Sequence, residues 1–328
     1  MEQDNTIWQQ LLLNKIATVM EQEDDGYYTV YRMNCPDGHG IRRVYRVFPG
    51  LDLAYDEMDT SDFSCIERAQ PHEKISRNVM EISYCREGRL ECEFQNGLYV
   101  YMGKGDFFAG MVDVFEGITA FPMEGYQGIS IYIYADTLSR RAPQLFEEVS
   151  VDISGIHERL SRNGMCFGRA KDQIERIFLD LYRAPESIGK FYLELKVTEL
   201  LLLLGIMDFS EKNEPPKYYP RQHVEIIKRI QEQITNDIRG RHTIDGLSAE
   251  HGISRTALKS CFKGVYGVPI ATYIKTYRMK SAAVMLRQTN SSVSDIAFRV
   301  GYENQSKFAA AFKEFSGMSP LGYRKSVV

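Results

Sequence analysis

The sequence has no long apolar run and few cysteines. Its longest apolar stretch, Leu200–Met207, falls far short of the ~20 residues that a membrane-spanning helix requires. The 6 cysteines form no CxxC pair, which favours a reducing compartment. Residues 1–5 are polar and acidic, unlike a secretory signal, and no nuclear-type basic cluster occurs. These absences predict a cytoplasmic bacterial protein that does not span a membrane.

Basic charge is scarce in the first two thirds of the chain. The whole chain carries 40 basic and 44 acidic residues, yet residues 221–328 hold 17 basic residues against 8 acidic ones. The net charge is therefore +9 in residues 221–328 and −13 in residues 1–220. A basic module of this kind is suited to binding a polyanion.

Length and composition predict several domains. The chain of 328 residues exceeds what one hydrophobic core usually organises. The stretch SEKNEPPKYYP interrupts helix and strand alike with charge and proline. We therefore expect a strand-rich domain over residues 1–150, a helical spacer over 151–210, a linker over 211–220 and a second domain over 221–328.

A pattern of two short helices joined by a glycine-bearing turn occurs twice near the C-terminus. One copy begins at Thr243 and the other at Ser292, and Gly252 of the first aligns with Gly301 of the second. Thr243 and Ser292 are suited to cap a helix, and each glycine lies where a helix must stop and reverse. This is the order of a helix-turn-helix, and two copies predict binding to two successive DNA grooves.

The second helix of each copy has an apolar face and a polar face. Leu258 and Phe262, and likewise Phe308 and Phe312, recur at helical spacing and should face the core. The opposite faces present the residues that we expect to contact DNA: Arg255, Thr256, Lys259, Ser260, Lys263, Asn304, Gln305, Ser306, Lys307, Ala310 and Lys313. Any single lysine is equally typical of a solvated helix face, but two repeated units on a basic domain favour DNA contact.

The segment Pro269–Gln288 between the copies is predicted to be a helix that starts at its proline. A helix of about 20 residues spans about 30 Å. This length is close to the ~34 Å between successive major-groove faces on one side of B-DNA. The two recognition helices are therefore expected to lie roughly one DNA turn apart.

Several motifs of this region are spaced as in a known family: Leu258-x-x-x-Phe262-Lys263, Arg278-Met279, Val300-Gly301-Tyr302 and Ser319-Pro320. Through them residues 221–326 resemble the DNA-binding domain of AraC/XylS-type transcription regulators, and SKFAAAFK resembles their siderophore-responsive branch. The resemblance implies a regulator that binds double-stranded operator DNA, with RNA polymerase as a further partner. Family members often carry arginine at the positions of Ser260 and Ala310, so the lysines should matter more here.

The chain before the linker is rich in short runs of Val, Ile, Tyr and Phe, one of which is residues 62–68. The turns Glu87-Gly88 and Asn96-Gly97 are typical of hairpins, and residues 6–21 are expected to form a helix. Such spacing predicts a sandwich or small barrel. The phrase YCREGRLECEFQNGLYVYMGKGDFF resembles the cupin-like sensor domain of the same family. The expected fold class is α+β: an N-terminal cupin-like β-barrel with helices, then an all-α DNA-binding domain with two helix-turn-helix units.

The predicted barrel lacks the residues that catalysis would need. Metal-using cupins hold their ion with an H-x-H pair, a nearby Glu and a later His. Here only His39 and His72 occur, far apart. A DNA-repair methyltransferase would need a Pro-Cys-His-Arg setting, but Cys35-Pro36 has the reverse order. We therefore expect no enzyme activity, no metal and no cofactor.

Binding remains as the expected role of the barrel. Strand alternation predicts that six side chains share the lumen side: Met80, Ile82, Tyr84, Leu90, Cys92 and Phe94. They are either plain core or, in part, the lining of a pocket for a small, partly apolar effector.

The predicted helix over residues 187–207 is apolar nearly all round and must be covered on several sides. One of its faces carries Phe191, Leu195, Thr198 and Leu202. Such helices after a cupin-like domain mediate dimerisation in related regulators, so the resemblance implies a homodimer. The sequence as a whole predicts an effector-controlled transcription regulator. The alternative is a constitutive or architectural DNA-binding protein whose barrel serves only assembly.

Overall fold

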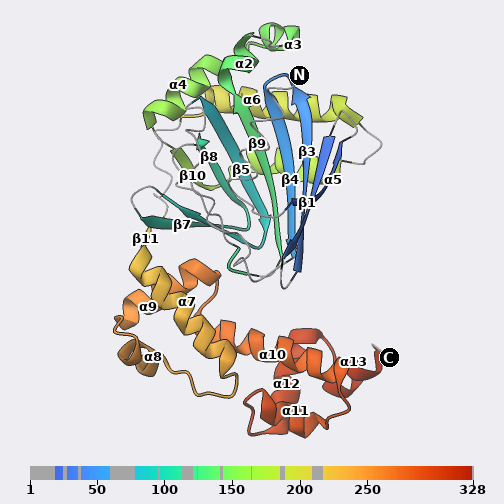
Figure 1. Ribbon diagram of the computed structural model, residues 1–328, viewed down its shortest axis with the longest axis vertical. Helices are drawn as coiled ribbons and strands as arrows, with labels where there is room; N and C mark the ends of the chain where they lie inside the picture. Colours follow the sequence, from blue (N-terminus) through green and yellow to red (C-terminus); the bar gives the residue numbers. More distant parts are fainter. Residues whose placement is uncertain are drawn as a thin grey trace. The chain divides into compact units, whose positions relative to one another are not determined.

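The computed structural model describes residues 19–24, 28–35, 38–59, 78–94, 97–112, 121–123, 125–140, 143–163, 165–184, 189–208 and 217–326. The chain divides into two compact units, Met1–Tyr218 and Tyr219–Val328. The N-terminal unit combines strands with helices, whereas the C-terminal unit consists almost entirely of helices (Figure 1). No helix in the described ranges is long and apolar enough to cross a membrane.

The N-terminal unit is built on an 8-stranded antiparallel sheet. Its strands, in spatial order, are β1 (Val19–Asp24), β2 (Tyr28–Cys35), β3 (Gly38–Phe48), β4 (Leu51–Asp59), β9 (Tyr126–Tyr134), β5 (Val79–Glu87), β8 (Asp106–Met111) and β10 (Met165–Arg169). Strands β6 (Arg89–Glu93) and β7 (Leu98–Gly103) pair in a smaller sheet. Within the described residues the edge strands β1 and β10 do not pair, so the large sheet is open and not a closed barrel.

The α+β class is confirmed, but two local predictions are wrong. Residues 19–21 belong to β1, whose backbone pairs with β2 in place of the hydrogen bonds of a helix. The rest of that predicted helix, and the strand predicted at 62–68, lie outside the described residues. The turn Glu87-Gly88 closes no hairpin, because β5 pairs with β8 and β9 while β6 pairs with β7.

Helices cover one face of the large sheet. They are α2 (Ala135–Arg140), α3 (Gln144–Glu148), α4 (Ile153–Asn163), α5 (Asp172–Arg183) and α6 (Gly189–Ile206). Every second residue of β4, β5 and β9 joins them in one buried core, as Leu53, Ile82 and Ile131 do. Each buried aliphatic side chain of this size contributes about 1.5–3 kcal/mol, so the core holds the helices on this face.

The other face of the sheet carries a buried polar band. Arg42 of β3 donates two hydrogen bonds to its cross-strand partner Asp56 on β4, and the Nη2–Oδ2 distance is 2.6 Å. Ser83 of β5 donates to Glu81 at 2.8 Å. The hydroxyl of Ser83 also lies 2.9 Å from that of its cross-strand partner Ser130. All five side chains are buried. We call these five residues the polar band.

The C-terminal unit contains seven described helices. They are α7 (Arg221–Asn236), α8 (Ile244–Glu250), α9 (Arg255–Tyr266), α10 (Ile270–Gln288), α11 (Val293–Arg299), α12 (Gln305–Ser316) and α13 (Pro320–Ser326). The pair α8–α9 is the first helix-turn-helix and the pair α11–α12 is the second. The predicted helix between them is α10, which begins at Ile270, one residue after the predicted start at Pro269.

Candidate functional site

The same local structure occurs in both helix-turn-helix units. Gly252 and Gly301, in the turns, have φ values of 63° and 81°, which a residue with a Cβ would disfavour. The ring centroids of Phe262 and Tyr273 lie 5.4 Å apart at 77°. The equivalent Phe312 and Tyr323 have the same separation and angle. The two copies of the sequence repeat therefore share both their turn conformation and the packing of equivalent aromatic side chains.

The two predicted helix caps are confirmed. Thr243 and Ser292 directly precede α8 and α11, and their hydroxyl oxygens accept a backbone hydrogen bond at 3.1 Å. Ser254 and Asn304 cap the recognition helices α9 and α12 in the same way, accepting a backbone bond at 3.2 Å and 3.0 Å. These caps fix the point at which each recognition helix starts, and so which side chains lie on its outer face.

The outer faces of α9 and α12 carry the residues predicted to contact DNA. Ser260 is half-buried. The other ten are exposed: Arg255, Thr256, Lys259, Lys263, Asn304, Gln305, Ser306, Lys307, Ala310 and Lys313. The ammonium groups of the four lysines have no ion-pair or hydrogen-bond partner among the described residues. Lysines in this state are available to neutralise phosphate.

Arg255 differs from these lysines because it has a partner. Its Nε lies 2.8 Å from Oδ1 of Asp245 in α8. In the second helix-turn-helix the aligned residues are Ser294 and Gln305, which carry no charge. Sequence reasoning did not identify this pair, because the two residues belong to different helices with no fixed spacing.

A second set of contacts joins the two helix-turn-helix units. Arg278 of α10 donates to the carbonyl oxygens of Ile238 and Gly240, each at 2.9 Å, and to that of Gly301 at 3.4 Å. The guanidinium carbon of Arg239 lies 3.9 Å from the ring centroid of Phe298. The segment between α7 and α8 therefore contacts the second turn, and α10 is not the sole connection between the recognition helices.

The structure separates the six residues that were predicted to share one lining. Met80, Ile82 and Tyr84 belong to the core under the helices. Leu90, Cys92 and Phe94 belong to a different cluster that includes Phe108 and Tyr126. The shared lining is wrong because β5 and β6 lie in different sheets, so alternation along each strand cannot relate their faces.

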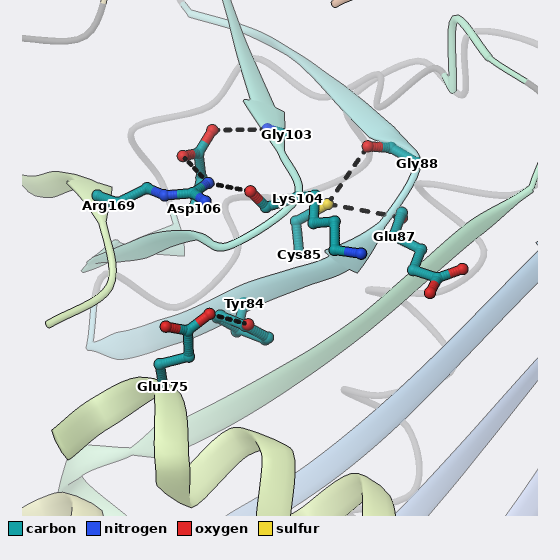
Figure 2. Close-up of polar contacts among 9 residues, drawn as sticks. All are labelled: Tyr84, Cys85, Glu87, Gly88, Gly103, Lys104, Asp106, Arg169 and Glu175. Atoms are coloured by element: carbon teal, nitrogen blue, oxygen red, sulfur yellow. Dashed lines mark hydrogen bonds and ion pairs between the residues drawn. The ribbon is translucent and has the colours of Figure 1, made fainter. Parts of the chain in front are cut away.

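Tyr84 illustrates this correction (Figure 2). Its hydroxyl donates to Glu175 of α5 at 3.1 Å, and its ring stacks on Phe178 at 4.9 Å. Burial, with help from the bond to Glu175, raises the pKa of Tyr84 to about 12. Tyr84 thus holds α5 against the sheet.

The neighbouring residue, Cys85, projects to the opposite face, where its thiol lies 3.6 Å from the carbonyl oxygen of Glu87 (Figure 2). Burial, followed by the charge of Asp106, raises the pKa of Cys85 to about 12. At neutral pH this thiol therefore stays protonated and is a poor nucleophile.

The predicted dimerisation face of α6 is partly exposed. Phe191 and Leu195 are 76% and 52% exposed, and Leu202 is half-buried. Thr198 is only 5% exposed and its hydroxyl donates to the carbonyl oxygen of Glu194, so its inclusion was wrong. Ile206, 83% exposed, continues the stripe one turn after Leu202.

The chain is similar to helix-turn-helix regulators. The family described as a helix-turn-helix domain matches residues 247–326. The HTH-type transcriptional activator AarP of Providencia stuartii is 33% identical over 118 residues, which are 35% of this chain and 87% of that protein. The F1 operon positive regulatory protein of Yersinia pestis is 35% identical over 99 residues, 30% of this chain and 32% of that protein. The chain thus spans most of the first relative and about a third of the second.

Solved structures resemble the chain more loosely. The C-terminal domain of AraT, a response regulator from Geobacillus stearothermophilus, is 29% identical, covering 31% of this chain and 84% of that one, with a TM-score of 0.30. ToxT from Vibrio cholerae O395 aligns with 92% of this chain and 97% of its own, at 11% identity and a TM-score of 0.28.

Proposed function

Because the chain belongs to the AraC/XylS family of transcriptional regulators, we propose that its C-terminal unit binds an operator through two successive major grooves. We further propose that its N-terminal unit adjusts this binding in response to a small molecule. The observation that carries the first proposal is the pair of equivalent recognition helices, whose lysines have no ion-pair or hydrogen-bond partner in the described part of the chain. In this proposal the protein acts in the bacterial cytoplasm as a homodimer and acts on RNA polymerase at the promoter.

The spacing of the recognition helices supports the two-groove arrangement. Helix α10 has 19 residues, and a helix of that length spans about 30 Å. The contacts of Arg278 and Arg239 tie the two helix-turn-helix units together on a second side. A rigid pair of recognition helices favours one face of the duplex, with contacts one turn apart.

Footprinting tests this arrangement. Duplexes selected from a random library by the full protein would be probed with hydroxyl radicals. We expect protection over about two major-groove turns per subunit, confined to one face of the duplex. Protection of a single groove would contradict the proposal.

For the effector we propose the sheet face that carries the polar band, and not the face under the helices. The Arg42–Asp56 pair and the Ser83–Ser130 pair are buried there. A buried ion pair often contributes less to stability than apolar residues of the same volume. We propose that this pair is kept because it takes part in binding the effector. A thermal-shift screen of the full protein against small molecules tests this, because a ligand of the folded state raises the melting temperature.

The alternative is a constitutive DNA-binding protein whose N-terminal unit serves only assembly. The exposed stripe of Phe191, Leu195, Leu202 and Ile206 on α6 favours a role in assembly under either proposal. A compound that raises the melting temperature and changes operator affinity would exclude the constitutive protein. Stabilisation without any change in DNA binding would favour it.

A further inference from the structure

The ion pair between Asp245 and Arg255 occupies the start of the first recognition helix. Arg255 is the first residue of α9, and Asp245 lies in the first turn of α8. Their side chains are 67% and 69% exposed, so the pair lies at the surface beside the residues proposed to contact bases. The second helix-turn-helix has Ser294 and Gln305 at these positions and hence no such pair.

The pair has little value for folding. An exposed ion pair of this kind contributes little to stability and weakens as salt rises. Its effect on DNA binding is of a different kind. While Arg255 is bound to Asp245, one positive charge is cancelled at the start of α9, and a carboxylate lies beside the residues proposed to contact DNA. Both effects disfavour DNA that docks loosely against this helix.

We propose that Arg255 is a gated phosphate contact and that Asp245 is its gate. In the free protein and on nonspecific DNA, Asp245 retains Arg255. On a selected sequence, base contacts by neighbours such as Thr256 and Lys259 seat α9 fully in the groove, and Arg255 then exchanges Asp245 for a phosphate. The exchange is feasible because the ion pair is weak. Asp245 would thus increase specificity by withholding one contact from every nonspecific site. This inference rests on the proposed DNA-binding function.

The salt dependence of binding tests the gate in the full protein. A phosphate contact changes the slope of log affinity against log salt by about one. Asp245→Asn should therefore steepen the slope on a nonspecific duplex by about one. It should also raise nonspecific affinity about 3- to 10-fold near 0.1 M salt. The slope on the selected duplex should change little, so the specificity ratio falls by about the same factor.

The reciprocal variant is Arg255→Ala. It should flatten the slope on the selected duplex by about one, because one phosphate contact is lost there. In the double variant Asp245→Asn/Arg255→Ala, the gain on nonspecific DNA should disappear. Asp245→Ser is a second test of the same carboxylate, because serine is the residue at the aligned position of the second helix-turn-helix. It should give the same result as Asp245→Asn unless asparagine itself disturbs folding.

Glu232→Gln on α7 is the matched control, because Glu232 is exposed and its side chain has no described basic partner. If Glu232→Gln steepened the salt slope on the nonspecific duplex as much as Asp245→Asn does, the effect would come from net charge alone, and the proposed role of Asp245 would be wrong. The proposal would also be wrong if the nonspecific salt slope stayed unchanged in both Asp245→Asn and Asp245→Ser. A wild-type protein that binds no duplex would instead refute the proposed function itself.

Discussion

Lys259, Gln305 and Lys313 are all exposed on the recognition helices, yet replacing them should have different effects. Lys259→Ala or Gln305→Ala should relax discrimination at one or two base pairs by about 1–3 kcal/mol each, because base-edge contacts carry specificity. Lys313→Ala should weaken binding to all sequences alike and flatten the salt slope by about one, because we propose that Lys313 contacts phosphate and not a base. Titrations with a selected duplex and its single-base variants measure both effects. If Lys259→Ala and Gln305→Ala left affinity and preference unchanged, these helices would not lie in the grooves.

Cys85 predicts a stability change at alkaline pH. Its pKa in the folded protein is about 12, against about 8.5 for an exposed thiol. Below the lower value both states keep the proton. Between the two values the unfolded chain loses a proton that the folded chain retains, so stability falls as pH rises. Urea midpoints from pH 8 to 11 should decline less steeply for Cys85→Ala than for the wild type. Equal slopes would show that the folded thiol ionises as readily as the unfolded one.

Single elements of the C-terminal unit could be predicted from the sequence because their signals are local. Thr243, Ser292 and Ser254 accept the expected backbone hydrogen bonds within three residues of themselves. The two turn glycines, Gly252 and Gly301, likewise have the positive φ values that their positions in the sequence predicted. Prediction of the candidate DNA-contact face required only helical spacing from these starting points. The ion pair between Arg255 and Asp245 could not be predicted in this way, because it joins two different helices.

Strand elements were predictable as strands, but their partners were not. The apolar and aromatic residues of β5 clearly predict a strand. However, β5 pairs with β8 and β9 and not with β6, which follows it in the sequence. Pairing depends on residues far along the chain, so nothing local distinguished Ile82, under the helices, from Cys92, in the other cluster. The polar band was missed for the same reason, because Arg42, Asp56 and Ser130 come from three different strands.

The exposed stripe of α6 leads to a prediction at the scale of an element. An apolar helix face of this kind would be covered by a second copy, so Leu195→Glu should shift the protein toward monomer. Leu145→Glu on α3, where the side chain is 36% exposed, is the matched control and should leave association unchanged. Sedimentation equilibrium measures both. Unaltered association of Leu195→Glu would place the dimer contact elsewhere.

At the scale of the whole molecule, the question is how the N-terminal unit influences the C-terminal unit. A ligand shifts an equilibrium only if it binds one arrangement more tightly than the other. Within the N-terminal unit, Tyr84 and Glu175 join the sheet to α5, and Asp180 of α5 lies 2.8 Å from the ammonium of Lys196 on α6. These contacts connect the sheet to α5 and α5 to α6, the helix that carries the exposed stripe.

Effector and operator should consequently change each other's affinity by the same factor. A coupling of about 1–3 kcal/mol corresponds to roughly 5- to 150-fold. We would measure operator affinity for the intact protein and for residues 215–328, each with and without a compound found by thermal shift. Of AarP, 87% aligns with 118 residues of this chain, so a relative consists of little more than one such unit. The compound should act on the intact protein alone. An equal effect on both proteins, or on neither, would refute control by the N-terminal unit.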